Sequence, residues 1–182
     1  LMAFDFTIEE SKLLKGVIII RPSVSSDIRG SIWTSFLKGE IDKLLPIGLN
    51  FKHDKFSEST HNVLRGIHGD NKSWKLVTSV YGEIQQVVVD CREHSHTYLQ
   101  WEKFVINKEN QQLILIPPNM GNAYYVSSKN AVYHYKLAYE GDYIDANEQF
   151  TCAWNDVSIN IDWPTDSPIL SDRDMTALSK KK

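Results

Sequence analysis

The sequence predicts an all-β protein, folded as a sandwich or a barrel with short peripheral helices. Short runs rich in Val, Ile, Tyr and Thr recur along its 182 residues. Gly, Asn, Asp and Pro separate these runs at the spacing typical of turns between short strands. Helical composition is confined to residues 40–48 and 171–180. These observations favour many short strands over a helical or mixed fold.

The expected strands follow one another in order along the chain. They cover residues 15–22, 30–37, 62–69, 74–82, 83–91, 99–107, 111–118, 122–128 and 131–139. The fourth and fifth runs form a hairpin, because Gly82 supplies a turn between them. Pro46 limits the first short helix to one or two turns. No repeat or linker interrupts this order, so we expect one domain over residues 1–182, frayed at residues 1–5 and 178–182.

Strand alternation sorts the side chains of two runs by face. Along residues 63–68, regular alternation puts Gly66 and His68 on one face and Arg65 on the other, unless a bulge near Gly66 breaks the pattern. Tyr133 and Tyr135 share a face in the same way. If that face lines the interior, a pair of phenols lines it too.

Charge, hydropathy and cysteine content narrow the class of function. The net charge of −3 argues against binding to nucleic acid or to a membrane surface, which usually needs a basic excess. The longest apolar run, GVIII, is only strand-sized, so we expect no membrane span and no signal peptide. Cys91 and Cys152 are far apart, so we expect no disulfide framework and a cytoplasmic protein.

Among the histidines, His68 stands out because Arg65 and Lys75 flank it. An imidazole beside fixed cations suits proton transfer on an anionic substrate, although composition alone favours a structural role for this histidine. His94 and His96 form an HxH pair that could ligate a metal, but they lie in a polar connection without a nearby acidic ligand, so we expect no metal. The chain has no nucleophile elbow and no glycine-rich phosphate loop, which leaves acyl transfer and nucleotide hydrolysis without machinery.

Five blocks give the sequence a family resemblance. In chain order they are VLRGIH, KLVTSVYGEIQQVVVDCR, LILIPPNMGNAYYV, YKLAY and IDWPTDSPILSDRD. Together they resemble the dTDP-4-dehydrorhamnose 3,5-epimerase family, from SSDIRGSIW to Asp174. The variants RGIHGDNKSWKL and PPNMGNAYYVSS look closest to the capsule-biosynthesis enzymes of campylobacters that epimerise GDP-linked 4-keto-heptoses. The resemblance implies a cupin-like jelly roll, a homodimer, and an isomerase that inverts carbons beside the C4 ketone of a nucleotide-diphosphate sugar without metal or cofactor.

The resemblance also assigns catalytic roles. His68 matches the general base, and Asp174 matches the carboxylate that orients it, with Asp172 as the alternative. Lys75 matches a lysine beside the developing enolate, and Tyr135 matches the acid that returns a proton from the opposite face. Because a ketone is a far weaker acid than imidazolium, such a site must also stabilise negative charge on O4.

The remaining matches concern substrate binding. Arg65 and Arg29 match arginines that contact the sugar and the diphosphate, although Arg29 also reads as a turn residue paired with Asp27. Asn122 replaces a second family histidine and cannot titrate, which predicts unequal handling of C3 and C5, or inversion at C3 alone. His53 and Lys55 replace a Gln and an Asn, and the loop between His68 and Lys75 is short. These changes suit a sugar that differs from rhamnose precursors, with a GDP-linked sugar favoured.

Three other functions remain open from the sequence. A 3,4-ketoisomerase on the same scaffold would begin with the same proton abstraction but would move the carbonyl. A non-catalytic sugar-nucleotide binding protein would need neither base nor acid, although residues for both are present. A metal-dependent cupin is the weakest alternative.

Overall fold

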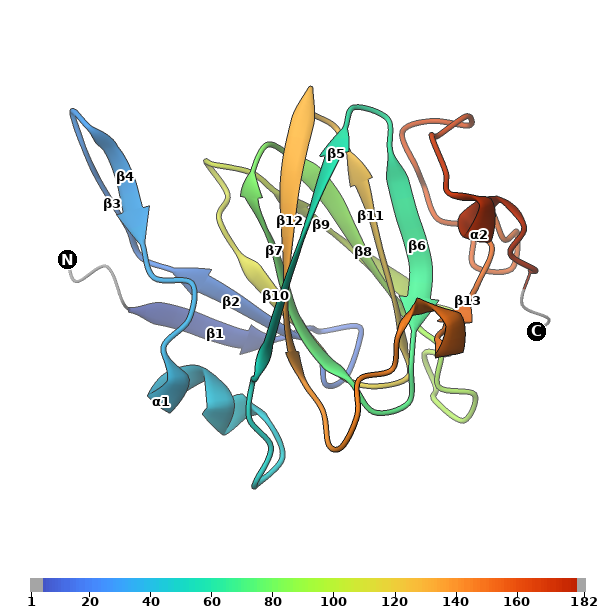
Figure 1. The fold of residues 1–182 in the computed structure, drawn as a ribbon, viewed down its shortest axis with the longest axis horizontal. Coiled ribbons are helices and arrows are strands. Elements are labelled where there is room, and N and C mark those ends of the chain that lie inside the picture. Colours follow the sequence, from blue (N-terminus) through green and yellow to red (C-terminus); the bar gives the residue numbers. More distant parts are fainter. Residues whose placement is uncertain (1–4, 180–182) are drawn as a thin grey trace.

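The computed structural model describes residues 5–179, which form two packed antiparallel sheets (Figure 1). The larger sheet has the order β1 (Phe6–Glu10), β2 (Ile18–Pro22), β10 (Leu113–Ile116), β7 (Trp74–Tyr81), β12 (Asn130–Ala138), β5 (His53–Thr60). The smaller sheet has the order β13 (Phe150–Thr151), β6 (Leu64–Gly69), β11 (Met120–Val126), β8 (Ile84–Asp90), β9 (Trp101–Ile106). This arrangement is the predicted all-β jelly roll. The fraying expected at the chain ends falls mainly on residues 1–4 and 180–182, which lie outside the described residues.

Two strands and two short helices lie outside these sheets. β3 (Val24–Asp27) and β4 (Gly30–Trp33) form a separate hairpin that projects from the body of the molecule (Figure 1). The helices α1 (Lys38–Ile41) and α2 (Asp172–Met175) overlap the two segments predicted to be helical, although α1 begins two residues before its segment, and a 3₁₀ turn (Asp42–Leu44) continues α1. No helix among residues 5–179 is long and apolar enough to cross a membrane.

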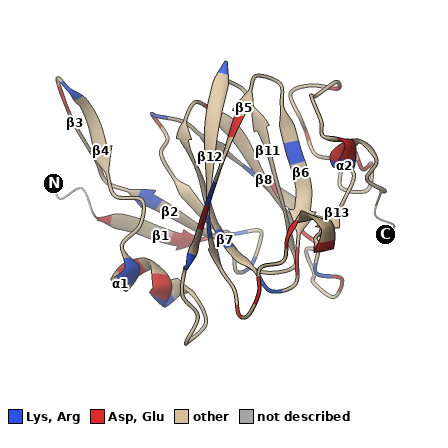
Figure 2. Cartoon of the chain, in the orientation of Figure 1, with Lys and Arg blue, Asp and Glu red and all other residues tan. Residues whose placement is uncertain are grey.

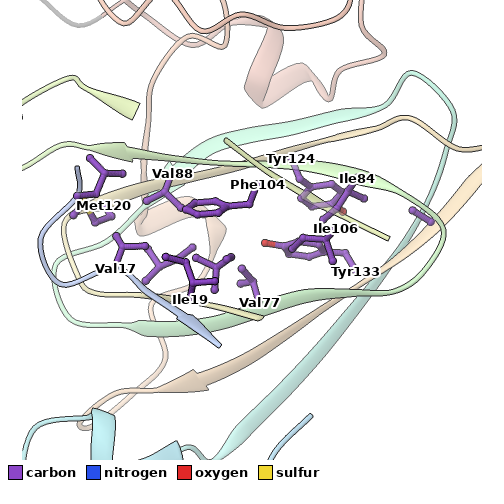
Figure 3. Packing of buried hydrophobic residues seen from close by; sticks show 14 of the residues in the cluster. Val17, Ile19, Val77, Ile84, Val88, Phe104, Ile106, Met120, Tyr124 and Tyr133 are labelled. Atoms are coloured by element: carbon purple, nitrogen blue, oxygen red, sulfur yellow. The ribbon is translucent and has the colours of Figure 1, made fainter. Parts of the chain in front are cut away.

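The main core lies between the two sheets (Figure 3). Val77 of β7 and Tyr133 of β12 meet Val88 of β8 and Phe104 of β9 there, and all four side chains are buried. Tyr135 packs against this cluster from the same face of β12 as Tyr133. The two phenols therefore share the interior face, as alternation predicted.

Each sheet is also covered on its outer face. Ile41 and Leu45, from α1 and the turn after it, pack with Leu76 and Leu115 on the larger sheet. Residues 150–163 cover the smaller sheet in the same way. Strands buried on both faces read as continuous apolar runs, which explains why LILI and VVV show no alternation.

β5 is the longest strand that the sequence did not predict. Its burial alternates, but the residues HDKFSEST are mostly polar on both faces. Lys55 and Ser57 line an internal cavity, whereas the alternating side chains of Asp54, Phe56 and Glu58 are exposed at the sheet edge. Charged residues of both signs are spread over many elements, and β6 carries a cationic position midway along its length (Figure 2).

Candidate active site

A cavity of about 300 Å³ opens between the two sheets. Its walls come from β5, β6, β7, β11, β12 and α2. Seven of the residues singled out in the sequence line it, namely Lys55, Arg65, His68, Lys75, Asn122, Tyr135 and Asp174. Two others do not line it. His53 contacts Tyr143, which is part of the lining, and Arg29 lies on the projecting hairpin.

A bulge in β6 brings Arg65 and His68 to the same wall. Arg65 pairs with Tyr124 of β11 and His68 with Asn122, so two residues of β6, Gly66 and Ile67, lie opposite the single residue Ala123 of β11. The regular alternation that would have separated Arg65 from His68 is therefore broken, as a bulge near Gly66 was expected to do. Gly66 has φ +132°, and a Cβ there would lie 2.5 Å from the Ala123 Cβ. Only glycine fits this bend without displacing β11.

His68 and Asp174 form a hydrogen-bonded pair. Nε2 of His68 lies 2.5 Å from Oδ1 of Asp174, and the Gly66 N–H donates to Oδ2 at 3.3 Å. Burial of Asp174 acts to raise its pKa, but the bonds from His68, Gly66 and Ser171 outweigh it and hold the pKa below its ordinary value. The ionised carboxylate must accept from Nε2–H, so in the neutral imidazole it is Nδ1 of His68 that carries the lone pair.

The chain after β13 places Asp174 against β6. Ile169 runs parallel to the start of β6, and its N–H and C=O bond to Asn62 and Leu64 at 2.8 and 3.0 Å. Ser171 then caps α2 by accepting from the Asp174 N–H at 3.2 Å. Asp174 is 3% exposed, whereas Asp172 faces solvent. Of the two carboxylates that the sequence left open, Asp174 is the partner of His68.

Lys75 is buried on the β7 side of the cavity. Burial lowers the pKa of its ammonium group, and the nearby charges of Arg173 and Lys55 lower it further. Asp70 opposes this shift, because its Oδ2 lies 3.7 Å from Nζ of Lys75. The sequence reasoning missed Asp70. Its other oxygen accepts from the backbone N–H groups of Lys72 and Ser73 at 3.0 and 2.6 Å, so the short loop after His68 fixes it.

Tyr135 lies on the wall opposite His68, because β12 and β6 belong to different sheets. Burial raises the pKa of Tyr135 well above that of a free phenol, and the nearby Tyr124 acts in the same direction. The phenol therefore keeps its proton at neutral pH. An imidazole and a protonated phenol thus face one cavity from two sides.

Positive charge dominates the cavity lining. Lys55, Arg65, Lys75 and Arg173 line it, against the single carboxylate of Asp174. The sequence reasoning also missed Arg173, whose Nε donates to Thr151 at 2.8 Å while a buried terminal nitrogen has no hydrogen-bond partner among the described residues. Its place within SDRD, one residue before Asp174, was the available signal. Such a lining favours an anionic ligand.

The remaining candidates lie elsewhere. Arg29 pairs with Asp27 at the tip of the hairpin, where the arginine side chain is 86% exposed. This contact agrees with the alternative in which Arg29 is a turn residue paired with Asp27. His53 bonds to Tyr139 at 3.1 Å and its ring contacts that of Tyr143, which lines the cavity. His94 and His96 border a separate cavity, and residues 5–179 contain no group of three or more metal-ligating side chains placed to hold an ion.

The fold and this cavity define a jelly-roll protein in which an imidazole and a protonated phenol meet in a cavity with a mostly cationic lining. Residues 11–181 match the family model described as dTDP-4-dehydrorhamnose 3,5-epimerase. The dTDP-4-dehydrorhamnose 3,5-epimerase of Shigella flexneri is 33% identical over 162 residues, covering 87% of this chain and 88% of the relative. The chain belongs to the dTDP-4-dehydrorhamnose 3,5-epimerase family and is an epimerase of the isomerase class.

Solved structures share the fold. The dTDP-6-deoxy-D-glucose-3,5-epimerase of Legionella pneumophila, in complex with dTDP-4-keto-L-rhamnose, has a TM-score of 0.86 at 32% identity over 96% of this chain and 93% of that chain. ChmJ, a 3'-monoepimerase of Streptomyces bikiniensis in complex with dTDP-quinovose, has a TM-score of 0.84 at 25% identity over 94% of this chain and 87% of that chain. These likenesses agree with the cupin-like jelly roll expected from the sequence.

Proposed function

We propose that this chain inverts C3 of a nucleotide-diphosphate 4-keto sugar without a cofactor, and C5 less readily or not at all. The observation that carries the proposal is the pairing of His68 with Asp174 across one cavity from the protonated Tyr135. Two solved relatives that hold dTDP-linked sugars support the substrate class.

In the proposed reaction, Nδ1 of His68 removes the proton on the carbon beside the ketone, and the electrons move onto O4 as an enolate. Asp174 stabilises the imidazolium that forms, at a distance of 2.5 Å. Each pKa unit of mismatch between carbon acid and base costs about 1.4 kcal/mol, so charge on O4 must be stabilised. We assign this role to Lys75, because it is buried in the cavity wall.

Inversion requires that the proton return from the other face. Tyr135 gives its proton to the enolate carbon, and the carbonyl re-forms at C4. The phenolate then regains a proton from solvent, while His68 loses one. The sum is an exchange of one carbon-bound hydrogen with water and the opposite configuration at that carbon.

Asn122 supports the unequal treatment of C3 and C5. It lines the cavity next to His68 but cannot act as a base. If the family histidine at this position assists one of the two inversions, its loss leaves the other. The similarity to ChmJ, a 3'-monoepimerase, is consistent with this.

Arg29 leads to a proposal about assembly. In its own chain it lies on the projecting β3–β4 hairpin, away from the cavity, and Ile28 and Ile32 on that hairpin are exposed (Figure 1). If Arg29 contacts the diphosphate, as the resemblance implies, it must do so in the cavity of a second copy. We therefore propose a homodimer, which sedimentation analysis of the wild type and of a protein lacking residues 24–33 would test.

The favoured substrate is a GDP-linked 4-keto-heptose, on the resemblance of the RGIHGDNKSWKL and PPNMGNAYYVSS blocks. A cytoplasmic location follows from the low cysteine content and is part of the same proposal. The test is incubation in D₂O with the GDP-linked 4-keto-heptose and, separately, with a dTDP-linked 4-keto-6-deoxy sugar, each ring position being followed by NMR. Deuterium at C3 of the GDP sugar supports the proposal, exchange only with the dTDP sugar contradicts the GDP preference, and a moved carbonyl indicates ketoisomerase activity instead.

A further inference from the structure

A buried amide pair lies behind one wall of the cavity. Gln86 of β8 is fully buried, and its Nε2 donates to Oδ1 of Asn122 at 2.6 Å. Asn122 borders the cavity, whereas Gln86 does not. The sequence reasoning did not single out Gln86, because a glutamine inside a valine-rich strand has no signal beyond its unusual polarity.

The direction of this hydrogen bond is fixed by the backbone. Nε2 of Gln86 also donates to the carbonyl of Val87 at 3.0 Å, and a carbonyl can only accept. The atom of Asn122 that meets Nε2 must therefore be its oxygen. On the other side, Oε1 of Gln86 accepts from the Tyr133 hydroxyl at 2.6 Å. Both the nitrogen and the oxygen of the Gln86 amide therefore have hydrogen-bond partners.

The tyrosine that completes the network is also held in place. Burial raises the pKa of Tyr133 well above its ordinary value, so it remains a donor. Its ring stacks on that of Tyr124 with centroids 4.0 Å apart, and Figure 3 shows the two rings side by side in the core. The Tyr124 hydroxyl lies 2.6 Å from Oγ of Ser57. The Tyr133 hydroxyl also reaches Oδ1 of Asn122 at 3.3 Å.

We propose that Gln86 is a positioning residue that turns the amide NH₂ of Asn122 toward the cavity, where it donates to a hydroxyl or carbonyl oxygen of the bound sugar. The proposal rests on the proposed function for the identity of the ligand. With Oδ1 held by the Gln86 N–H, Nδ2 is the atom left to face the cavity, and no hydrogen bond within residues 5–179 uses it. A site that offers only a donor selects a sugar oxygen and rejects an analogue that lacks it.

The test replaces the donor at Gln86 with a group that loses its hydrogen when ionised. In Gln86→Glu, the protonated acid can still donate to Asn122, but the carboxylate can only accept, so the Asn122 amide flips and presents oxygen to the cavity. Burial raises the pKa of such an acid toward neutral pH. The matched control is Gln85→Glu, which adds the same charge at the next residue of β8, on the opposite face.

The probe is an unreactive analogue of the proposed substrate, a GDP-linked heptose with a hydroxyl group at C4. Because it has no ketone, it can bind but cannot form the enolate. Calorimetry measures its dissociation constant between about pH 5.5 and 8.5. At each pH the dissociation constant of a variant is divided by that of wild type, which removes the effect of groups that titrate in both proteins. We expect Gln86→Glu to bind like wild type at the acid end and about tenfold more weakly at the alkaline end, while Gln85→Glu keeps a constant ratio. A ratio for Gln86→Glu that does not change with pH overturns the proposal.

A second variant covers the case in which Gln86→Glu unfolds at high pH. Gln86→Met removes both amide contacts without adding charge, and we expect weaker binding at every pH; wild-type affinity would contradict the positioning role. Failure of the proposed reaction is a separate outcome. A wild-type protein that binds the probe but incorporates no deuterium into the 4-keto sugar contradicts the reaction and leaves the comparison at Gln86 intact.

Discussion

His68 and Asp174 are 106 positions apart in the chain, yet Nε2 of the imidazole lies 2.5 Å from Oδ1 of the carboxylate. The pair depends on the docking of Ile169 beside β6, which brings α2 to the wall that carries His68. Asp174 sets the tautomer of His68 and leaves Nδ1 free to accept a proton. The chemistry proposed for this chain follows from that arrangement.

Asp174→Asn tests the orienting carboxylate. The amide oxygen can still accept from Nε2–H, but it no longer stabilises the imidazolium, so kcat/KM should fall by about 10²–10⁴. Asp172→Asn is the matched control, because Asp172 lies on the same helix and faces solvent. Steady-state kinetics that show equal losses in the two variants would rule out a special role for Asp174.

Tyr135→Phe should separate exchange from inversion. His68 remains able to remove the carbon-bound proton, so deuterium incorporation in D₂O persists, but the proton no longer returns from the opposite wall. We expect net inversion to slow by about 10²–10⁴ while exchange at C3 continues. Tyr139→Phe is the control, since Tyr139 bonds to His53 outside the cavity. Loss of exchange and inversion in parallel would show that Tyr135 is not only the acid.

Asp70→Asn tests the cation beside the enolate. The change removes the anion 3.7 Å from Nζ of Lys75 while keeping the loop contacts of an amide oxygen. Because burial already lowers the pKa of Lys75 and Asp70 opposes that shift, the pKa should fall further. The alkaline limb of the kcat/KM profile should then move to lower pH, and Asp142→Asn on the nearby exposed loop should leave it in place. An unmoved limb would show that the charge of Lys75 does not limit the reaction.

Gly66→Ala tests the bulge that brings Arg65 and His68 together. The new methyl group would lie 2.5 Å from the Ala123 Cβ, in a backbone conformation with φ +132°. We expect a loss of about 2–4 kcal/mol in unfolding free energy, measured by urea denaturation, together with lost activity. Gly141→Ala is the control, with φ +64° and no atom within 4 Å of the new Cβ, and it should lose only about 1 kcal/mol. Equal losses would remove the steric explanation.

The contacts of Asp90 predict how the stability of the fold changes at acid pH. It accepts from Arg92, Ser95 and Thr97, and although burial acts to raise its pKa, these bonds lower it to about 2. A carboxylate with a depressed pKa stabilises the fold above its unfolded pKa near 3.8 and loses that contribution as pH falls toward about 2. Asp90→Asn should lower the melting temperature at pH 7 and flatten its dependence on acid pH, whereas Asp166→Asn on the surface should do neither. A variant with the steep acid dependence of wild type would contradict this.

The sequence was most informative where strands are apolar or alternate. β7, β8, β10 and β12 were predicted because their side chains pack on both faces or alternate cleanly. β5 was missed because its inward residues line a cavity and its outward residues meet solvent, so neither face is apolar.

The site was predicted to a similar extent. The family resemblance supplied His68, Lys75, Tyr135 and Asp174, and the structure brings all four to one cavity. Asp70, Gln86 and Arg173 were not found. Gln86 and Arg173 contact residues 36 and 22 positions away in the chain, and Asp70 lies in the loop after β6, where strand periodicity does not apply. Periodicity reports faces of a strand, and it carries no information about such partners.

The most direct measurement is the rate at which C3 of a 4-keto nucleotide sugar acquires deuterium from D₂O, followed by NMR for wild type and for His68→Ala. If Nδ1 of His68 removes the proton, wild type should incorporate one deuterium at C3 per turnover, and the variant should be slower by at least about 10². A His68→Ala protein that exchanges C3 at the wild-type rate would contradict the role of His68 as the base.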